Sequence, residues 1–229
     1  MKKILVGLVS CLATFANAAT LDCENSYPLF EEIIQEKTDV ENVGGVDDIY
    51  NYIQHYDYTY IFNKNHPDKQ FWVDKHLSFA KPSWSNNEWI SKSEFNKRIK
   101  VIAKHNVKDP SNPYIHELLP PKANLLTQSG EICVVPVQAY LEVEVDAEPD
   151  EGENQNTSET VVVEAMLIDH IFVRDIKNNK WRVLAFNRYI ADNDFNEFFP
   201  DLSDHIKNEL NDGIEEAEEA MVEQIEIQE

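Results

Sequence analysis

The chain has 229 residues, with 42 acidic and 20 basic side chains, and its formal net charge is −22. A chain of this charge is repelled by nucleic acid and by anionic membrane surfaces, so neither is an expected partner. It attracts basic proteins, although acidity of this degree also serves solubility alone.

The first residues, MKKILVGLVSCLATFANAAT, predict a cleaved secretory signal peptide over residues 1–18. Two lysines come first, an apolar stretch follows, and small residues precede the cleavage site. A lipoprotein cut before Cys11 is the alternative, but it leaves only about seven apolar residues in the middle region. No later stretch reaches the roughly 18 apolar residues of a membrane-spanning helix. We therefore predict a periplasmic protein.

Two cysteines, Cys23 and Cys133, remain after the signal peptide is removed. In an oxidising compartment an even pair predicts one disulfide bond, which would join the N-terminus to a central strand. Two free buried thiols are the alternative interpretation.

Helices are expected first in the mature chain. YPLFEEIIQEK and VDDIYNYIQHY carry apolar residues at helical spacing, and Gly44-Gly45 separates them. DYTYIFN then predicts a short strand. The residues SKSE, Ser91 to Glu94, fit a capping box at the start of an amphipathic helix with a basic outer face.

The second half of the chain predicts long strands. After a proline-punctuated loop, DPSNPYIHELLPPKAN, the alternation in ICVVPVQAYLEVEVD indicates a half-buried strand, and Pro136 favours an edge or a bulge at its start. A long acidic loop, AEPDEGENQNTSE, leads to VVVEAMLIDHIFVRDIKNNKWRVLAFNR, which predicts a β-hairpin.

This hairpin places two charged residues on an apolar face. If the chain turns at Asn178-Asn179, Asp169 lies opposite Arg188, at a Cβ separation of roughly 4.5–5.5 Å. The two would either form an ion pair that closes one end of the core or orient a polar ligand at the mouth of a pocket. His170 lies on the other face, where we expect it to pack against its neighbours.

The C-terminal region, residues 191–229, predicts a long acidic helix with one apolar stripe. The stripe comprises Ile206, Leu210, Ile214, Ala217, Met221 and Ile225. It must be buried either on its own domain or on another chain, so a homodimer stays open.

This order of elements, with its closing NNKWRVLAFN, resembles the NTF2-like, or cystatin-like α+β, superfamily over about Val46 to Tyr189. The resemblance implies an α+β fold in which a curved antiparallel sheet packs on helices as a cone, here over residues 19–190. Members include isomerases, dehydratases, transport factors, immunity proteins and dimerisation modules, so the fold does not define a function. Enzymes of the superfamily use an aspartate in the cone, but no local motif assigns that role to a residue of this chain.

The sequence shows no motif for catalysis or for binding a metal. Its seven histidines have no zinc-ligand spacing, and neither a nucleophile motif nor a phosphate-binding glycine loop occurs. We therefore predict no catalytic residue, metal or cofactor. Whether the protein is an enzyme stays open, with a binding role favoured.

Three functions compete. The first is a periplasmic binding or inhibitor protein, such as an immunity protein that neutralises a basic toxin delivered by a competing bacterium. Its expected partner-binding residues are Glu148, Asp150, Glu151, Glu153, Ile206, Leu210, Ile214 and Met221. The second is an NTF2-like enzyme or small-ligand binder with the pocket candidates Asp169, Arg188, Tyr140 and Tyr189. The third is an accessory factor that docks on an envelope or secretion assembly through the tail.

Overall fold

A computed structural model of the chain describes residues 21–43, 45–73, 88–105, 114–128, 130–146 and 158–213. In chain order its elements are η1 (Glu24–Ser26), α1 (Tyr27–Val43), α2 (Val46–Tyr56), η2 (Thr59–Asn65), β1 (Phe71–Val73), β2 (Glu88–Ile90), α3 (Lys92–His105), β3 (Tyr114–Leu118), β4 (Ala123–Thr127), β5 (Gly130–Asp146), β6 (Ser158–Asp175), β7 (Lys180–Ala185), α4 (Asp192–Phe198) and α5 (Asp204–Asn208).

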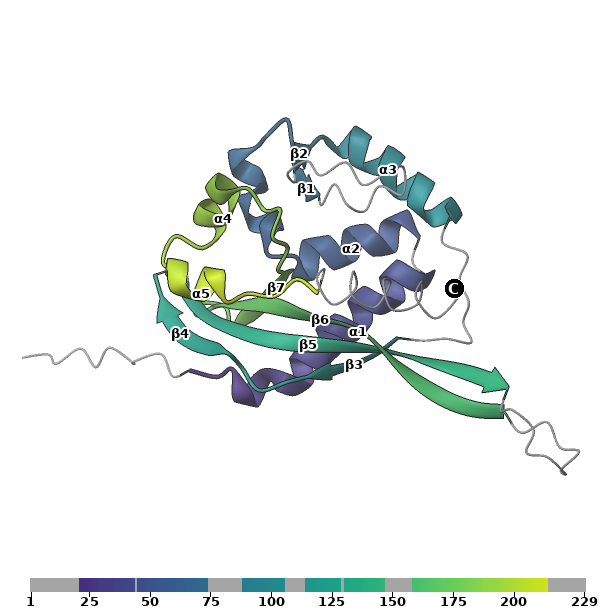
Figure 1. The fold of residues 1–229 in the computed structure, drawn as a ribbon. Coiled ribbons are helices and arrows are strands. Elements are labelled where there is room, and N and C mark those ends of the chain that lie inside the picture. The colour runs from purple at the N-terminus through teal and green to yellow at the C-terminus, as the bar shows by residue number, and fades with distance from the viewer. Residues whose placement is uncertain are drawn as a thin grey trace, which may run out of the picture.

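A strongly curled antiparallel sheet of five strands forms the centre of the fold (Figure 1). Its strands follow the order β3-β5-β6-β7, and β4 pairs with β5 beyond the end of β3. β5 and β6 are the longest strands and pair with each other from one end to the other. Every other strand of this sheet joins one of these two.

Both faces of the sheet are covered by helices or by the 3-10 helix η2. On one face Cys133, Val135 and Phe172 pack with Phe30 and Ile33 of α1. On the opposite face the core comprises Tyr58, Ile132, Val134, Ile171, Phe195, Phe198 and Phe199. Because neighbouring residues of a strand point to opposite faces, cover on both sides explains the continuous apolar run ICVV in β5.

A smaller core lies between α2, α3 and the two-stranded sheet of β1 and β2. Tyr50 of α2 contacts the rings of Phe71 and Phe95, at centroid distances of 5.2 and 5.4 Å. The Ser91 hydroxyl accepts a hydrogen bond from the Glu94 N–H, which is one of the two bonds of the predicted capping box, while the Glu94 carboxylate contacts Arg98.

The first two helices match the sequence prediction, but DYTYIFN is not a strand and forms η2 instead. The Asp57 carboxylate accepts hydrogen bonds from the Thr59 N–H and hydroxyl at 2.7 and 2.6 Å. These two bonds turn the chain locally and favour a helical course over an extended one. The stretch DPSNPYIHELLPPKAN is predicted as a loop, but it contains β3. That prediction is therefore also wrong in part.

Pro136 lies inside the sheet rather than at its edge. Its carbonyl accepts a hydrogen bond from the Leu119 N–H at 2.9 Å, while the residue opposite it on β6 is Asp169. β4 pairs with β5 only as far as Val134, and β3 begins to pair at Val137. In an antiparallel strand the N and O of one residue face the same neighbour, so the missing N–H of Pro136 falls in the gap between β4 and β3.

The described part of the C-terminal region is not one long helix, which corrects the sequence prediction. α4 and α5 are both short, and α5 ends at Asn208. The chain then extends, so that Asp212 forms an antiparallel β-bridge with Ile168. Gly213 follows with a positive φ of 73°, a conformation that glycine adopts without a steric penalty.

The beginning of the predicted apolar stripe is partly buried on the protein's own domain. Ile206 and Leu210 pack against the same core as Phe195 of α4. Ile214 and Met221 lie outside the described residues. The first part of the stripe therefore packs on the core, and a role of Ile206 and Leu210 in partner binding stays a prediction.

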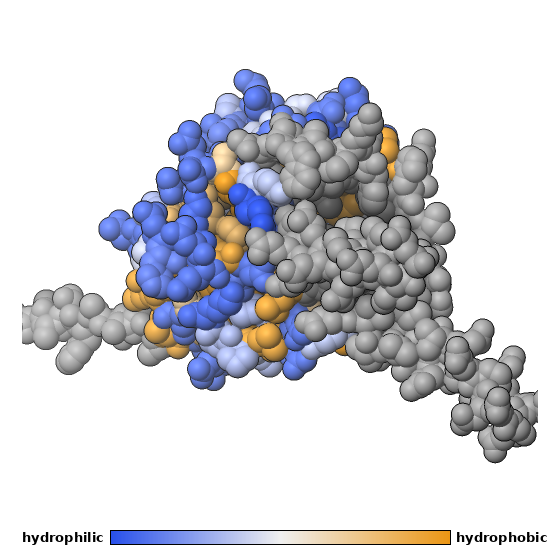
Figure 2. All heavy atoms as spheres, in the orientation of Figure 1, coloured by the Kyte–Doolittle hydropathy of each residue, from blue (hydrophilic) through white to orange (hydrophobic). Residues whose placement is uncertain are grey.

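The chain is a mixed α+β protein with a curled antiparallel sheet, as predicted. The NTF2-like cone, the signal peptide and the domain boundary at residue 190 stay predictions, and residues 1–20 lie outside the described part. Within the described ranges, no helix combines the length and apolar character needed to cross a bilayer. On the face seen in Figure 2, hydrophilic side chains surround separate hydrophobic areas.

Candidate binding groove

The hairpin of β6 and β7 turns over the four residues 176–179, which is wider than predicted. Asp175 pairs with Lys180, and the Asp175 carboxylate accepts hydrogen bonds from the Lys177 N–H and the Asn178 side chain at 2.9 and 2.8 Å. Asn179 takes a left-handed φ of 53°. These local bonds set a register that the sequence letters alone left ambiguous.

Asp169 consequently does not face Arg188, and the predicted ion pair between them is wrong. The Phe186 N–H donates to the Asp169 carbonyl at 2.7 Å. A shift of the register by an even number of positions keeps every residue on its predicted face. Ile171 and Leu184 accordingly share one core, as expected, although the partners across the strands differ.

Asp169 is fully buried and holds two other segments of the chain. Its Oδ2 accepts hydrogen bonds from the Lys122 ammonium and from the Asn211 N–H, both at 2.6 Å. Lys122 also donates to the Glu209 carbonyl at 3.2 Å. The carboxylate therefore ties the start of β4 and the segment after α5 to the end of the β6–β7 pairing.

Arg188 has a separate acidic partner. Its backbone N–H and its guanidinium donate to the Asp212 carboxylate over distances of 2.6–2.9 Å. Asp212 is buried, whereas the Arg188 side chain is about one-third exposed. This bidentate pair holds the same C-terminal segment that Asp169 contacts, so both residues serve packing of that segment.

The two tyrosine candidates lie elsewhere. The Tyr140 hydroxyl donates to Glu117 on β3 at 3.0 Å, and the Tyr189 N–H donates to the Asn187 side chain in the turn after β7. Tyr140 stands four residues along β5 from the position opposite Asp169, which is roughly 13 Å in an extended strand. The structure therefore does not bring the four predicted pocket residues together.

His170 occupies the other face of β6, as predicted, and it is buried. Its Nδ1 lies 3.1 Å from the Ile168 carbonyl, and its ring stacks near Phe172. Burial, with a smaller contribution from the nearby Lys37 charge, lowers the pKa of His170 to about 3. The imidazole is therefore neutral at physiological pH and serves as a packing residue.

Sequence reasoning also missed the ion pair between Glu131 and Arg174, in which both side chains are buried. Glu131 and Arg174 face each other across β5 and β6, with Oε2 and Nη2 2.5 Å apart. Glu131 Oε1 also accepts hydrogen bonds from the N–H groups of Asp22 and Cys23, at 2.7 and 3.0 Å. The predicted disulfide between Cys23 and Cys133 is present, with Cα atoms 5.8 Å apart. Together these contacts fasten the start of α1 to β5.

A hollow of about 650 Å³ lies between α1 and β3, and we refer to it as the acidic groove. It is lined by Pro28, Glu31, Glu32, Gln35, Glu36, Asp39, His116 and Leu118. The α1 residues of this set recur at helical spacing on the exposed side of the helix, while Phe30, Ile33 and Ile34 are buried on the other side. Sequence periodicity therefore gives α1 one apolar and one acidic face.

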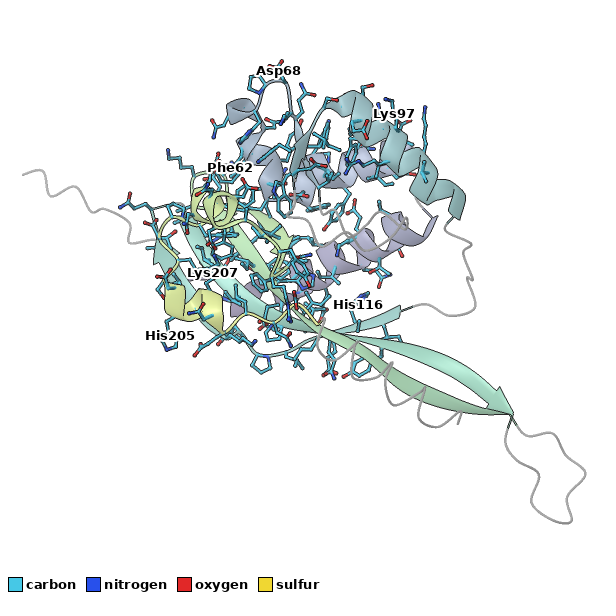
Figure 3. All side chains as sticks on the ribbon, turned by 45° about the horizontal axis from the view of Figure 1, so that its top comes forward. Phe62, Asp68, Lys97, His116, His205 and Lys207 are labelled. Atoms are coloured by element: carbon cyan, nitrogen blue, oxygen red, sulfur yellow. A yellow bond between two sulfur atoms is a disulfide. The ribbon has the colours of Figure 1, made fainter. Side chains whose placement is uncertain are left out.

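The acidic groove combines four carboxylates with the apolar side chains of Pro28 and Leu118. His116, labelled in Figure 3, comes from β3, and its Nδ1 lies 3.4 Å from the Thr38 hydroxyl of α1. Among the lining residues that the structure describes there is neither lysine nor arginine. Carboxylates around a hollow with protein walls concentrate negative potential there, which favours a cationic ligand.

The acidic groove is not among the partner-binding residues that the sequence predicts. Glu148, Asp150, Glu151 and Glu153 lie outside the described residues. The groove could not be read from the sequence, because α1 and β3 are far apart along the chain and meet only through packing. The available signal was the acidic face of α1, which carries Glu31–Asp39 next to its apolar face.

The described residues contain no group of three or more histidine, cysteine or acidic side chains arranged to hold a metal ion. Comparison of the chain with protein-family models, with curated proteins and with solved structures gives no match. The resemblance to the NTF2-like superfamily therefore stays a prediction, and the function is argued below from the geometry alone.

Proposed function

We propose that this chain is an exported binding protein whose acidic groove receives a basic segment of a partner protein. The observation that carries the proposal is the set of four carboxylates, Glu31, Glu32, Glu36 and Asp39, around one hollow of about 650 Å³. The inhibitor class described above, an immunity protein that neutralises a basic toxin, is the form of this function that we favour.

Three physical properties support a role in protein binding. The groove volume lies within the range of roughly 300–1,000 Å³ that is typical of ligand sites. The net charge of −22 attracts a basic partner over distance and raises its association rate. The disulfide and Glu131 fasten the backbone at the start of α1 to β5, which fixes where the helix carries its carboxylates before a partner arrives.

The disulfide also supports the predicted periplasmic location of the protein. A bond between Cys23 and Cys133 persists in an oxidising environment such as the periplasm, and it agrees with the signal peptide predicted over residues 1–18. An enzyme at Asp169 is not favoured by the geometry, because the Asp169 carboxylate is buried and bonded to Lys122 and Asn211.

A decalysine peptide is a direct probe of the groove. In amide NMR spectra of the mature protein, titration should shift the signals of residues 31–39 and 116–118, and affinity should fall as salt rises. The variant Glu32→Lys should weaken binding about thirtyfold, because an attraction of about 1 kcal/mol becomes a repulsion of similar size, a change of about 2 kcal/mol.

The variant Asp68→Lys is a matched control with the same change in charge. Asp68 is exposed, and Figure 3 shows it at a different end of the molecule from His116. Used as immobilised baits, the wild type and Asp68→Lys should retain a basic secreted protein that Glu32→Lys releases. Equal weakening by the two variants would mean that net charge, not the groove, attracts the probe, and the proposal would then be withdrawn.

A further inference from the structure

A carboxylate of α4 contacts the end of η2 through two successive residues. The Asn65 side-chain N–H donates to Glu197 Oε1 at 3.0 Å. His66, which caps the C-terminal end of η2, places its Nε2 3.6 Å from the other carboxylate oxygen, Glu197 Oε2. Glu197 therefore joins two elements that lie far apart along the chain.

The His66 imidazole also stacks on Trp89 of β2. The two ring centroids are 4.0 Å apart, and the angle between the ring planes is 10°. Trp89 is only 8% exposed, and its ring contacts that of Phe198 in α4. The imidazole thus lies on a buried indole with its Nε2 close to a carboxylate. We refer to His66, Trp89 and Glu197 as the latch.

A neutral imidazole leaves one polar atom of the latch unsatisfied. His66 Nε2 is shielded from solvent and forms no hydrogen bond within the described part of the chain. A distance of 3.6 Å is too long for a hydrogen bond, and a buried polar atom without a partner is unfavourable. In the imidazolium, both ring nitrogens carry a hydrogen. A movement of about 0.5 Å then converts the contact with Glu197 into a charge-assisted hydrogen bond.

A positive charge on the ring also strengthens its contact with Trp89. A cation within about 6 Å of the centroid of a tryptophan ring is attracted by the negative face of that ring. Both contacts of the His66 ring, with Glu197 and with Trp89, therefore favour the imidazolium over the neutral imidazole. Histidine is the side chain that commonly changes its charge between pH 5 and 8.

The other charged residues on the described elements around the latch have separate partners or face solvent. The acids of α4 and β2 are bonded elsewhere, in the pairs Asp192–Lys207, Asp194–Trp72 and Glu88–Arg98. The charged side chains of η2 and of the residues just after it are exposed, and they are Lys64, Asp68 and Lys69. Glu197 is therefore the charged group that responds most directly to protonation of His66.

We propose that His66 is a proton-operated latch, which fastens α4 to the end of η2 more tightly when the imidazole is protonated. As the pH falls, the imidazolium gains a bond to Glu197 and an attraction to Trp89, and α4 opens less often from the core. The buried His170 responds in the opposite direction, because its protonation destabilises the folded state. This inference is independent of the acidic groove and goes beyond the proposed binding function.

Hydrogen exchange of the oxidised protein, followed by mass spectrometry, tests the latch. The exchange rate of the α4 amides in His66→Gln is divided by the wild-type rate at the same pH, so that intrinsic exchange and the effect of His170 cancel. This ratio should be about fivefold larger at pH 5.5 than at pH 8. The ion pair and the cation–π contact are both partly exposed, and each should slow the opening of α4 by about two- to threefold.

His205→Gln is a matched control, because His205 forms an exposed pair with Glu209 on α5 at 3.3 Å. Figure 3 shows His205 well apart from Phe62 of η2. The control ratio should be the same at both pH values. In a Glu197→Gln background, the fivefold difference for His66→Gln should fall to about twofold, since only the contact with Trp89 remains.

Two outcomes of the exchange experiment would overturn the proposal. One is a ratio for His66→Gln that is equal at pH 5.5 and pH 8, which would mean that His66 only fills space. The other is a fivefold difference that persists without the Glu197 carboxylate, because another group would then respond to the proton.

The wild type alone gives a second test, through the NMR signals of the indole N–H groups. The Trp89 signal should shift between pH 5 and 8 with the same midpoint as the ring signals of His66. The Trp181 signal, from the opposite face of the sheet, should not follow that midpoint. A Trp89 signal that stays constant over this range would overturn the proposal, even if the variants were too unstable to study.

Discussion

The buried carboxylate of Asp169 permits a test that separates two partners. The sequence predicts that Asp169 pairs with Arg188, whereas the structure pairs it with Lys122 at 2.6 Å. Two double-mutant cycles compare these possibilities. One combines Asp169→Asn with Lys122→Met, and the other combines Asp169→Asn with Arg188→Met.

The expected size follows from the geometry. Two unit charges 2.6 Å apart attract by about 6 kcal/mol at an effective dielectric constant of 20. The Lys122 side chain is 37% exposed and also binds the Glu209 carbonyl, so solvent and a second partner reduce its dependence on Asp169. We expect a coupling energy of about 1.5–3 kcal/mol, the range for hydrogen bonds to charged groups. The coupling of Asp169 with Arg188 should stay below about 0.5 kcal/mol.

Urea unfolding of the oxidised protein at pH 7 gives the free energies for both cycles. The single variant Asp169→Asn should itself cost about 1.5–3 kcal/mol, because it removes a charge-assisted hydrogen bond while solvent and the Glu209 carbonyl still reach the partly exposed Lys122 ammonium. A coupling below about 0.5 kcal/mol for Asp169 and Lys122 would refute the reasoning. So would a coupling with Arg188 that equals or exceeds it, because the hairpin would then have the register predicted from sequence.

Three further stability measurements follow. Replacing Cys23 and Cys133 by serine should lower the free energy of unfolding by about 4.8 kcal/mol, because the disulfide closes a loop of 110 residues in the unfolded chain. A loss below about 2 kcal/mol would show that this bond is not a major source of stability. The His170 pKa of about 3 lies below its unfolded value of 6.5, so the unfolded state binds the proton first as pH falls, and stability should drop below pH 6.5 by up to about 1.4 kcal/mol per pH unit. His170→Gln should flatten that slope between pH 4.5 and 6.5, and an unchanged slope would contradict a buried neutral imidazole. Gly130→Ala should cost at least about 2 kcal/mol by thermal unfolding, because Gly130 has a φ of 136° and a Cβ there would lie 2.1 Å from the Arg174 carbonyl oxygen; a neutral effect would show that the backbone adapts.

Periodicity predicted the elements that depend on burial of one or two faces. α1, α2, α3, β5 and the hairpin of β6 and β7 all occur where the apolar pattern places them. Local polar bonds caused the errors. Asp57 turns DYTYIFN into a 3-10 helix through Thr59, and Asp175 widens the hairpin turn. Such bonds depend on single side chains, so a pattern of apolar and polar letters does not reveal them.

The candidate site was harder to predict than the fold. The distance between α1 and β3 depends on the packing of Phe30 and Ile33 on the sheet, and no local pattern encodes which strand a helix will meet. The partner of Asp169 was missed for a similar reason, since Lys122 belongs to a segment that the sequence predicts as loop. The disulfide between Cys23 and Cys133 was predictable, because only one pair of cysteines remains after the predicted signal peptide.

Two of the buried carboxylates, Glu131 and Asp169, perform the same task at different ends of the described chain. Glu131 accepts the N–H groups of Asp22 and Cys23, and Asp169 accepts the N–H of Asn211. Each of these N–H groups belongs to a segment that enters or leaves the fold outside the named strands, where no ladder would satisfy it. Apolar burial lacks direction and cannot fix the position of such a segment, whereas a carboxylate inside a strand specifies one backbone position. The N-terminal attachment therefore sets where α1, and with it the acidic groove, lies on the sheet. The C-terminal attachment holds Asn211 beside β6, so loss of Glu131 should loosen α1 and spare this segment, and loss of Asp169 should do the reverse.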